Sequence, residues 1–302
     1  MSDVLVVAGH ALRESLRRRV FAVVVCLTLA FGALYAWGTS ELFEDLAEFG
    51  PNDFGLDTRT LAGATILGLA MFGTLFLGVV LAVFLTLGAV RGDAERGLLQ
   101  PLIVRPLGRR QYLAGRFLAA ATVSGAYVLV VYAGAVVVTG TIGDWWPSSP
   151  VGAGVRLAGA VVVIAALAVL GSIFLSANAN GIAVLMVFGA GLLAGLLGSI
   201  GEALESGTLQ TLANTASWLL PFEALYRDAL RVLVAEIPGV TGAIIQLGPL
   251  GGSHDAGLLF YPYAVAYLAV VAVVAAFAFG RSDLRPGVSA GCIRSVPPGA
   301  RG

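Results

Sequence analysis

The chain has 302 residues, of which 58% are apolar, only 12% are charged and 40 are glycine. A soluble globular protein carries roughly 25% charged residues, because much of its surface must be solvated. The composition therefore excludes a soluble domain and indicates an integral membrane protein. The formal net charge is zero, so the sequence shows no basic footprint for a nucleic acid, and none is expected as a partner.

The amino-terminal stretch 3–19 is amphipathic at helical spacing. Arg13, Arg17 and Arg18 fall on its polar face, while Leu5, Leu12 and other apolar residues occupy the opposite face. A basic face opposite an apolar face predicts an interfacial helix that lies in the plane of the lipid headgroups.

A membrane-spanning helix needs about 20 apolar residues. Uncharged runs predict an all-α membrane protein with six such spans, at about 20–40, 61–90, 115–142, 156–176, 180–201 and 257–280. The run 157–201 is long enough for two spans, and the short polar residues of 176–181 predict the break, with Asn178 and Asn180 capping helix ends. We interpret residues 1–284 as one transmembrane domain and 285–302 as a disordered cytoplasmic tail.

The predicted spans contain no charged residue within their apolar runs. We therefore expect no proton relay and no buried ion site inside the membrane. The two cysteines, Cys26 and Cys292, predict neither a disulfide framework nor a metal site, and no cofactor is expected on this chain.

Arginine placement predicts the orientation. All 18 basic residues are arginine, and 14 of them fall in segments 1–19, 91–116 and 281–302, which lie on one side of a six-span topology. Positive charge near span ends stays on the cytoplasmic side. Both termini are therefore predicted to be cytoplasmic, in a multi-pass protein of the cell membrane.

The absence of lysine excludes two chemistries. A Walker A loop needs its lysine on the nucleotide phosphates, and Schiff-base enzymes need a lysine amine. We therefore expect that this chain is not an enzyme and does not itself hydrolyse ATP.

The connection between the second and third spans, residues 91–116, is the most informative segment. It is polar at both ends and apolar in the middle, which indicates a docking surface for another protein on the cytoplasmic side. The residues that we expect to make this contact are Asp93, Glu95, Arg96, Gly97, Leu98, Leu99, Leu102, Arg105, Pro106, Arg109 and Arg110.

These residues carry a family resemblance. The pattern Glu95-x-Gly97-x-Leu99, followed by Arg105-Pro106-x-x-Arg109-Arg110 and by Gly115-Arg116 at the start of a span, resembles the signature of type-2 permeases of ATP-binding cassette (ABC) transporters. That family typically shows an acid, a Gly-Thr-Leu, a Pro-x-x-Arg and a Gly-Lys at these positions. Here Leu98 replaces the threonine and Arg116 replaces the lysine. With the six spans and the amphipathic first helix, the resemblance covers residues 3–284.

The resemblance implies a function. Residues 93–110 would be a coupling element that inserts into a separate ATPase subunit, and that subunit would bind ATP and Mg. The chain would be the permease of an exporter, working among membrane lipids as a homodimer or as a pseudo-symmetric heterodimer. The missing Walker lysine agrees with this division of labour.

The segment 201–255 before the last span also shows helical spacing, around Leu219 to Arg231. Glu223 and Arg227 are i,i+4 partners in it. We expect this outer segment to be a structural cap over the mouth of the pathway, with a substrate-binding surface as the alternative. Upstream, the spacing of Gly191 and Gly195 permits a close contact with another helix, and an interface between two copies of the chain is one form of such a contact.

The sequence argues against two other classes of function, a secondary transporter and an intramembrane enzyme. A secondary transporter should show internal repeats or charged pathway residues, and neither is evident. A membrane metalloprotease needs H-E-x-x-H, which is absent. A serine-type intramembrane enzyme needs a histidine within a span, and both histidines, His10 and His254, lie outside the predicted spans. The substrate stays open among drugs, lipids, peptides and metal-maturation cargo.

Overall fold

A computed structural model describes residues 19–48, 57–87, 109–234, 257 and 259–281. All regular structure in these ranges is helical. The helices are α2 (Arg19–Glu48), α3 (Thr58–Thr86), α6 (Arg109–Gly143), α7 (Pro150–Phe174), α8 (Ala177–Ala203), α9 (Gly207–Leu219), α10 (Pro221–Val234) and α12 (Phe260–Arg281).

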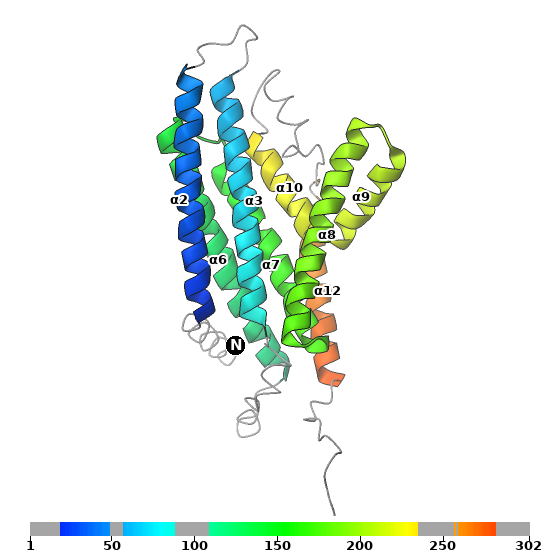
Figure 1. The fold of residues 1–302 in the computed structure, drawn as a ribbon. Helices are drawn as coiled ribbons and strands as arrows, with labels where there is room; N and C mark the ends of the chain where they lie inside the picture. The colour runs from blue at the N-terminus through cyan, green and yellow to red at the C-terminus, as the bar shows by residue number, and fades with distance from the viewer. Residues whose placement is uncertain (1–18, 49–56, 88–108, 235–256, 258, 282–302) are drawn as a thin grey trace, which may run out of the picture.

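The all-helical fold and its six spans are confirmed. Six of these helices, α2, α3, α6, α7, α8 and α12, are long and apolar enough to cross a membrane. Consecutive spans alternate in direction, so α2 begins at one end of the bundle and α3 ends there (Figure 1). We call the end where α2 begins the Arg19 end, and the end where α2 finishes the Glu48 end.

The core lies where α3, α6 and α7 meet. Leu67, Met71 and Leu75 of α3 are fully buried, and so are Leu157 and Ile164 of α7. Gly78 of α3 permits a close approach: a Cβ there would lie 2.5 Å from a methyl of Val128 and 3.0 Å from a methyl of Val161. Helix α7 is therefore the centre of the bundle, with helices on several sides.

Local chemistry fixes several helix ends. Asp57 caps α3, because its carboxylate accepts a hydrogen bond from the Thr60 backbone N–H at 3.1 Å and another from the Thr60 hydroxyl at 2.5 Å. These two bonds hold the pKa of Asp57 below its ordinary value. After α6 and α8, Asp144 and Glu205 adopt positive φ values of 51°, a left-handed conformation that ends a helix.

The predicted break between the fourth and fifth spans is confirmed, since α7 ends at Phe174 and α8 begins at Ala177. The expected role of Asn180 is wrong. Its side chain is buried and its Nδ2 donates to the Ala168 carbonyl of α7 at 2.9 Å. The amide therefore joins two spans instead of capping one of them, because the short turn brings the first turn of α8 against α7.

The segment expected to be a cap forms a helical hairpin whose second helix enters the bundle. Helix α9 runs back along α8, and α10 then returns beside α7 (Figure 1). At the start of α10, Phe222 packs against Gly191, which lies halfway along α8. Farther along α10, Val232 reaches the level of Gly152, near the start of α7. Helix α10 therefore fills the Glu48 half of the bundle, because its own apolar face needs burial.

Candidate functional site

The residues predicted to couple this chain to a partner mostly lie outside the described ranges. This holds for Asp93, Glu95, Arg96, Gly97, Leu98, Leu99, Leu102, Arg105 and Pro106, and also for Arg13, Arg17 and Arg18 of the predicted interfacial helix. Arg109 and Arg110 are the first two residues of α6. The predicted 285–302 tail also falls outside the described residues.

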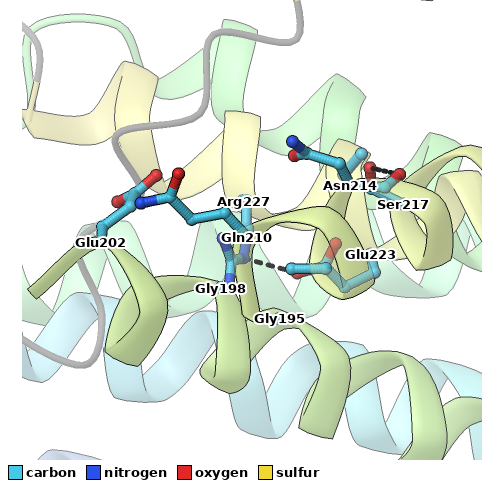
Figure 2. Close-up of a pocket in the computed structure, with 10 residues that line it drawn as sticks. Gly195, Gly198, Glu202, Gln210, Asn214, Ser217, Glu223 and Arg227 are labelled. Carbon is cyan, nitrogen blue, oxygen red and sulfur yellow. Dashed lines mark hydrogen bonds and ion pairs between the residues drawn. The ribbon is translucent and has the colours of Figure 1, made fainter. Parts of the chain in front are cut away.

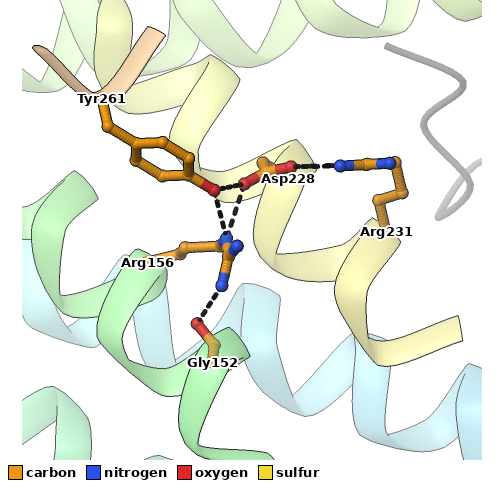
Figure 3. Close-up of polar contacts among 5 residues, drawn as sticks. All are labelled: Gly152, Arg156, Asp228, Arg231 and Tyr261. Carbon is orange, nitrogen blue, oxygen red and sulfur yellow. Dashed lines mark hydrogen bonds and ion pairs between the residues drawn. The ribbon is translucent and has the colours of Figure 1, made fainter. Parts of the chain in front are cut away.

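A charged cluster, which sequence reasoning missed, joins α7, α10 and α12 in the Glu48 half of the bundle. At its centre Asp228 of α10 is 1% exposed. Its Oδ2 accepts hydrogen bonds from Arg156 Nε and from the Tyr261 hydroxyl, both at 2.5 Å, and its Oδ1 accepts one from Arg231 Nη2 at 3.1 Å (Figure 3). We call these four residues the Asp228 cluster.

Arg156 is held on three sides within this cluster. Besides Asp228, its Nε lies 2.8 Å from the Tyr261 hydroxyl, and its Nη1 donates to the Gly152 carbonyl one turn earlier in α7 at 2.9 Å. Its guanidinium also lies 5.4 Å from the centre of the Tyr261 ring, within the range of a cation–π contact. Three elements distant in sequence are thus joined through one carboxylate.

A second ion pair lies on the side of α10 that faces α8. Glu223 Oε1 accepts from Arg227 Nε at 2.5 Å, and both side chains are largely buried. Gly195 and Gly198 of α8 leave room for this pair, because a Cβ at Gly195 would collide with the Glu223 carboxylate (Figure 2). The predicted i,i+4 pairing of Glu223 with Arg227 is confirmed. Among the described residues, the close contact that Gly191 and Gly195 permit is made with α10 of the same chain.

A polar cavity of about 70 Å³ opens between α8, α9 and α10 beside this ion pair. Gln210, Asn214 and Ser217 of α9 line it opposite Glu223 and Arg227 (Figure 2). One buried water needs only about 10–15 Å³ of cavity volume, so this cavity has room for a few waters or one small polar group.

The expectation that spans carry no charge is wrong. The span α7 contains Arg156, and the span Gln111–Gly143 of α6 contains Arg116, which is 9% exposed. The uncharged runs begin directly after Arg116 and Arg156, and the predicted spans 115–142 and 156–176 include these two arginines only at their first turn. The expectation therefore overlooked charges at the span ends, which the structure places inside helices. One signal was available: Pro150 follows two serines, and proline favours the first turn of a helix.

Among the described residues, no group of three or more histidine, cysteine, aspartate or glutamate side chains is arranged to hold a metal ion. Five charged side chains of the Glu48 half, Arg156, Glu223, Arg227, Asp228 and Arg231, are instead paired with one another. The arrangement therefore supplies mechanical links between helices, with cation and carboxylate in contact in a partly dehydrated place.

The six long apolar helices of the described residues, with α7 at their centre, define a multi-pass integral membrane protein. Comparison with family models narrows this class: residues 5–284 match the ABC-2 family transporter protein model. The chain belongs to this family, and it is a membrane permease of an ABC transporter. A comparison with curated proteins found no match. The resemblance inferred from residues 93–116 is thereby confirmed at the level of the family.

Proposed function

We propose that this chain is the permease of an ABC exporter, and that a separate ATPase subunit drives it through residues 93–110. Permeases of this family work with an ABC ATPase in general. The observation that carries the proposal for this chain is the 91–116 connection, where an apolar centre lies between arginines. This connection joins the end of α3 to the start of α6, and both of these helix termini lie at the Arg19 end of the bundle.

The charges of the described residues support a cytoplasmic Arg19 end. Arg19, Arg109, Arg110, Arg116 and Arg281 all lie in the helix turns at that end, where the described helix turns carry no acid. The ten described carboxylates all belong to the Glu48 half or to its connections. Since positive charge is retained in the cytoplasm, both termini and the 88–108 connection are cytoplasmic in this proposal.

In this proposal ATP and Mg bind to the partner, and this chain contributes no catalytic residue. The coupling element transmits the partner's closure to the spans as a rigid-body displacement. Two copies, or this chain and a similar one, enclose the pathway, and the interfacial helix with Arg13, Arg17 and Arg18 anchors the entrance in the headgroup layer. The substrate class is left open.

Co-purification tests the coupling. The tagged full chain is extracted from its native membrane in mild detergent, and bound proteins are identified by mass spectrometry. We expect a protein with a Walker A motif in near-stoichiometric amount, reduced at least tenfold by Glu95→Ala with Arg96→Ala. Glu44→Ala with Asp45→Ala, at the opposite end, is the matched control. Recovery of the chain alone, with transport intact, would instead support a secondary transporter.

Orientation and direction need separate measurements. Alkaline phosphatase fused after residue 302 should be inactive, and the same enzyme inserted after residue 52 should be active, because it folds only outside the cytoplasm. Direction follows from cells loaded with a panel of amphipathic dyes. Export predicts lower dye content in cells that express the chain and its ATPase than in cells that lack them, and a higher content would refute export.

A further inference from the structure

The end of α3 packs against the start of α8 at the Arg19 end of the bundle (Figure 1). Gly181 of α8 is buried, and a Cβ there would lie 3.3 Å from a methyl of Leu87 and 3.4 Å from a methyl of Val83. Leu87 caps α3 and is the last described residue before the 88–108 connection. A contact between two spans therefore lies directly beside the connection that we assign to the ATPase.

The residue before Gly181 fastens α8 to α7. Asn180 is buried, and its Nδ2 donates to the Ala168 carbonyl at 2.9 Å. Its Oδ1 lies over Gly171, where a Cβ would collide with it. Since α7 ends at Phe174 and α8 begins at Ala177, the connection between them is also short. The start of α8 is thus held on α7 while it packs against the end of α3.

One half of the Asn180 amide has no partner. Among the described residues, its Oδ1 is buried and accepts no hydrogen bond. A buried acceptor without a donor is unfavourable, and such groups are uncommon in folded proteins. A second arrangement of the helices in which a donor reaches this oxygen gains a hydrogen bond that the present arrangement lacks. The amide therefore suits a joint with two positions.

A donor stands on the face of α3 that packs against α8. Val83, Thr86 and Leu87 are at i, i+3 and i+4, so they share one side of the helix. Thr86 is 1% exposed, and its hydroxyl donates within its own helix, to the carbonyls of Ala82 at 2.9 Å and of Val83 at 3.0 Å. A hydroxyl rotates to suit its partner, so Thr86 can exchange these bonds for one to Asn180 when the end of α3 shifts.

We propose that Asn180 and Gly181 form a two-position joint that passes a displacement of the 88–108 connection from α3 to α7 and α8. In the position seen in the structure, Val83 and Leu87 pack on Gly181. In the driven position, the end of α3 has shifted and Thr86 donates to Asn180 Oδ1. Asn180 is a positioning residue in this scheme. The joint rests on the proposed function, because the ATPase supplies the displacement.

Disulfide cross-linking in the co-purified complex follows the joint. The two native cysteines are replaced by serine, and one engineered pair is oxidised with and without Mg and a non-hydrolysable ATP analogue. Val83→Cys with Gly181→Cys reports the position seen in the structure, and its cross-linking should fall at least threefold with nucleotide. Thr86→Cys with Asn180→Cys reports the driven position, and its cross-linking should rise at least threefold.

A third cysteine pair controls for general loosening of the fold. Gly198→Cys with Ala213→Cys joins α8 to α9 in the Glu48 half, where a Cβ at Gly198 would lie 3.0 Å from that of Ala213. The cross-linking of this pair should not change with nucleotide. A parallel fall in the control pair, or nucleotide-independent cross-linking of the two pairs at the joint, would overturn the proposal.

The hydrogen bond has its own matched variants. Thr86→Val keeps the shape of the side chain and removes the donor, so nucleotide should no longer lower the cross-linking between positions 83 and 181. Thr65→Val should keep the full response, because Thr65 is an exposed residue of the same helix whose hydroxyl donates to the Leu61 carbonyl at 2.8 Å. A full response in Thr86→Val would refute the assigned hydrogen bond and with it the joint.

Failure of the joint and failure of the proposed function give different results. If no ATPase co-purifies with the chain that has its native residues at the joint, both ideas are wrong. If the ATPase is recovered and the cross-linking at the joint ignores nucleotide, the joint alone is wrong. Each variant is compared at equal recovery of the ATPase, which separates a loss of folding from a loss of movement.

Discussion

Replacing Asp228 with asparagine tests whether the Asp228 cluster holds α10 in place. The substitution keeps the size of the side chain and removes its charge. Asp228 is 1% exposed and is the shared acceptor for Arg156, Tyr261 and Arg231. An asparagine offers one oxygen in place of two, and its NH₂ group points a donor at groups that are themselves donors.

The expected cost follows from these contacts. A hydrogen bond to a charged group contributes roughly 1.5–3 kcal/mol, and removing one partner of a fully buried pair costs about 3–5 kcal/mol. The side chains of Arg156 and Arg231 are 24% and 33% exposed, so water recovers part of the loss. We therefore expect a destabilisation of about 2–3 kcal/mol, which corresponds to roughly 4–10 °C in apparent Tm for a chain of this size.

The assay is thermal unfolding of the detergent-purified chain at a fixed heating rate, because membrane proteins commonly unfold irreversibly. Asp144→Asn is the control: its carboxylate is 83% exposed and 3.4 Å from Arg59, and such surface pairs contribute little. A double-mutant cycle with Arg156→Gln should give a coupling of about 1–3 kcal/mol. Additive effects, or an unchanged Tm for Asp228→Asn, would refute the reasoning.

Three further substitutions use the same assay. Gly195→Ala should destabilise by about 1–3 kcal/mol, because its Cβ would meet the ion pair of α10, whereas Gly189→Ala meets open space and should be neutral or stabilising; equal Tm shifts would contradict this. Glu205→Gly should stabilise by about 0.5–1 kcal/mol by relieving its φ of 51°, and a lower Tm would argue against strain there. Asp57→Ala should cost about 1 kcal/mol at neutral pH. Because the folded pKa of Asp57 is lowered, this difference should shrink as the pH falls below about 3.8 and through that folded pKa, and a gap that stays constant down to low pH would be inconsistent with the cap.

Hydropathy alone was enough for the six spans, because each must bury about 20 apolar residues whatever its neighbours are. The break near Asn178 was equally local, since it needed only short polar residues and a glycine. The Asp228 cluster was not predictable in this way. Arg156 and Asp228 are 72 residues apart, and Arg156 and Tyr261 are 105 apart. Nothing in either local pattern specifies the pairing.

The same reasoning explains why the sequence predicts a cap over the mouth of the pathway for the segment that contains α10, and not a helix inside the bundle. Glu223, Arg227, Asp228 and Arg231 give the segment the charge of a solvated helix. In the structure each of these charges has a partner, and Phe222 and Ala229 are fully buried beside them. A charged residue is excluded from a membrane bundle only when it is unpaired. The pairing depends on tertiary contacts that the sequence pattern does not contain.

The Glu223–Arg227 pair and the Asp228 cluster link α10 to its neighbouring helices with unequal strength. Glu223 and Arg227 belong to the same helix, so this pair adds no ionic link to α8; contact there consists of packing against glycines and a weak bond of 3.4 Å from Arg227 to Ser199.

Asp228 lies five residues, or about 140° of helical rotation, from Glu223. It binds cationic and hydroxyl donors on α7 and α12. Separating α10 from α8 therefore costs packing and one weak hydrogen bond, whereas separating it from α7 leaves a buried carboxylate without its arginine. In any rearrangement of the Glu48 half, α10 should stay with α7 and α12, and α8 is the helix that can move away first.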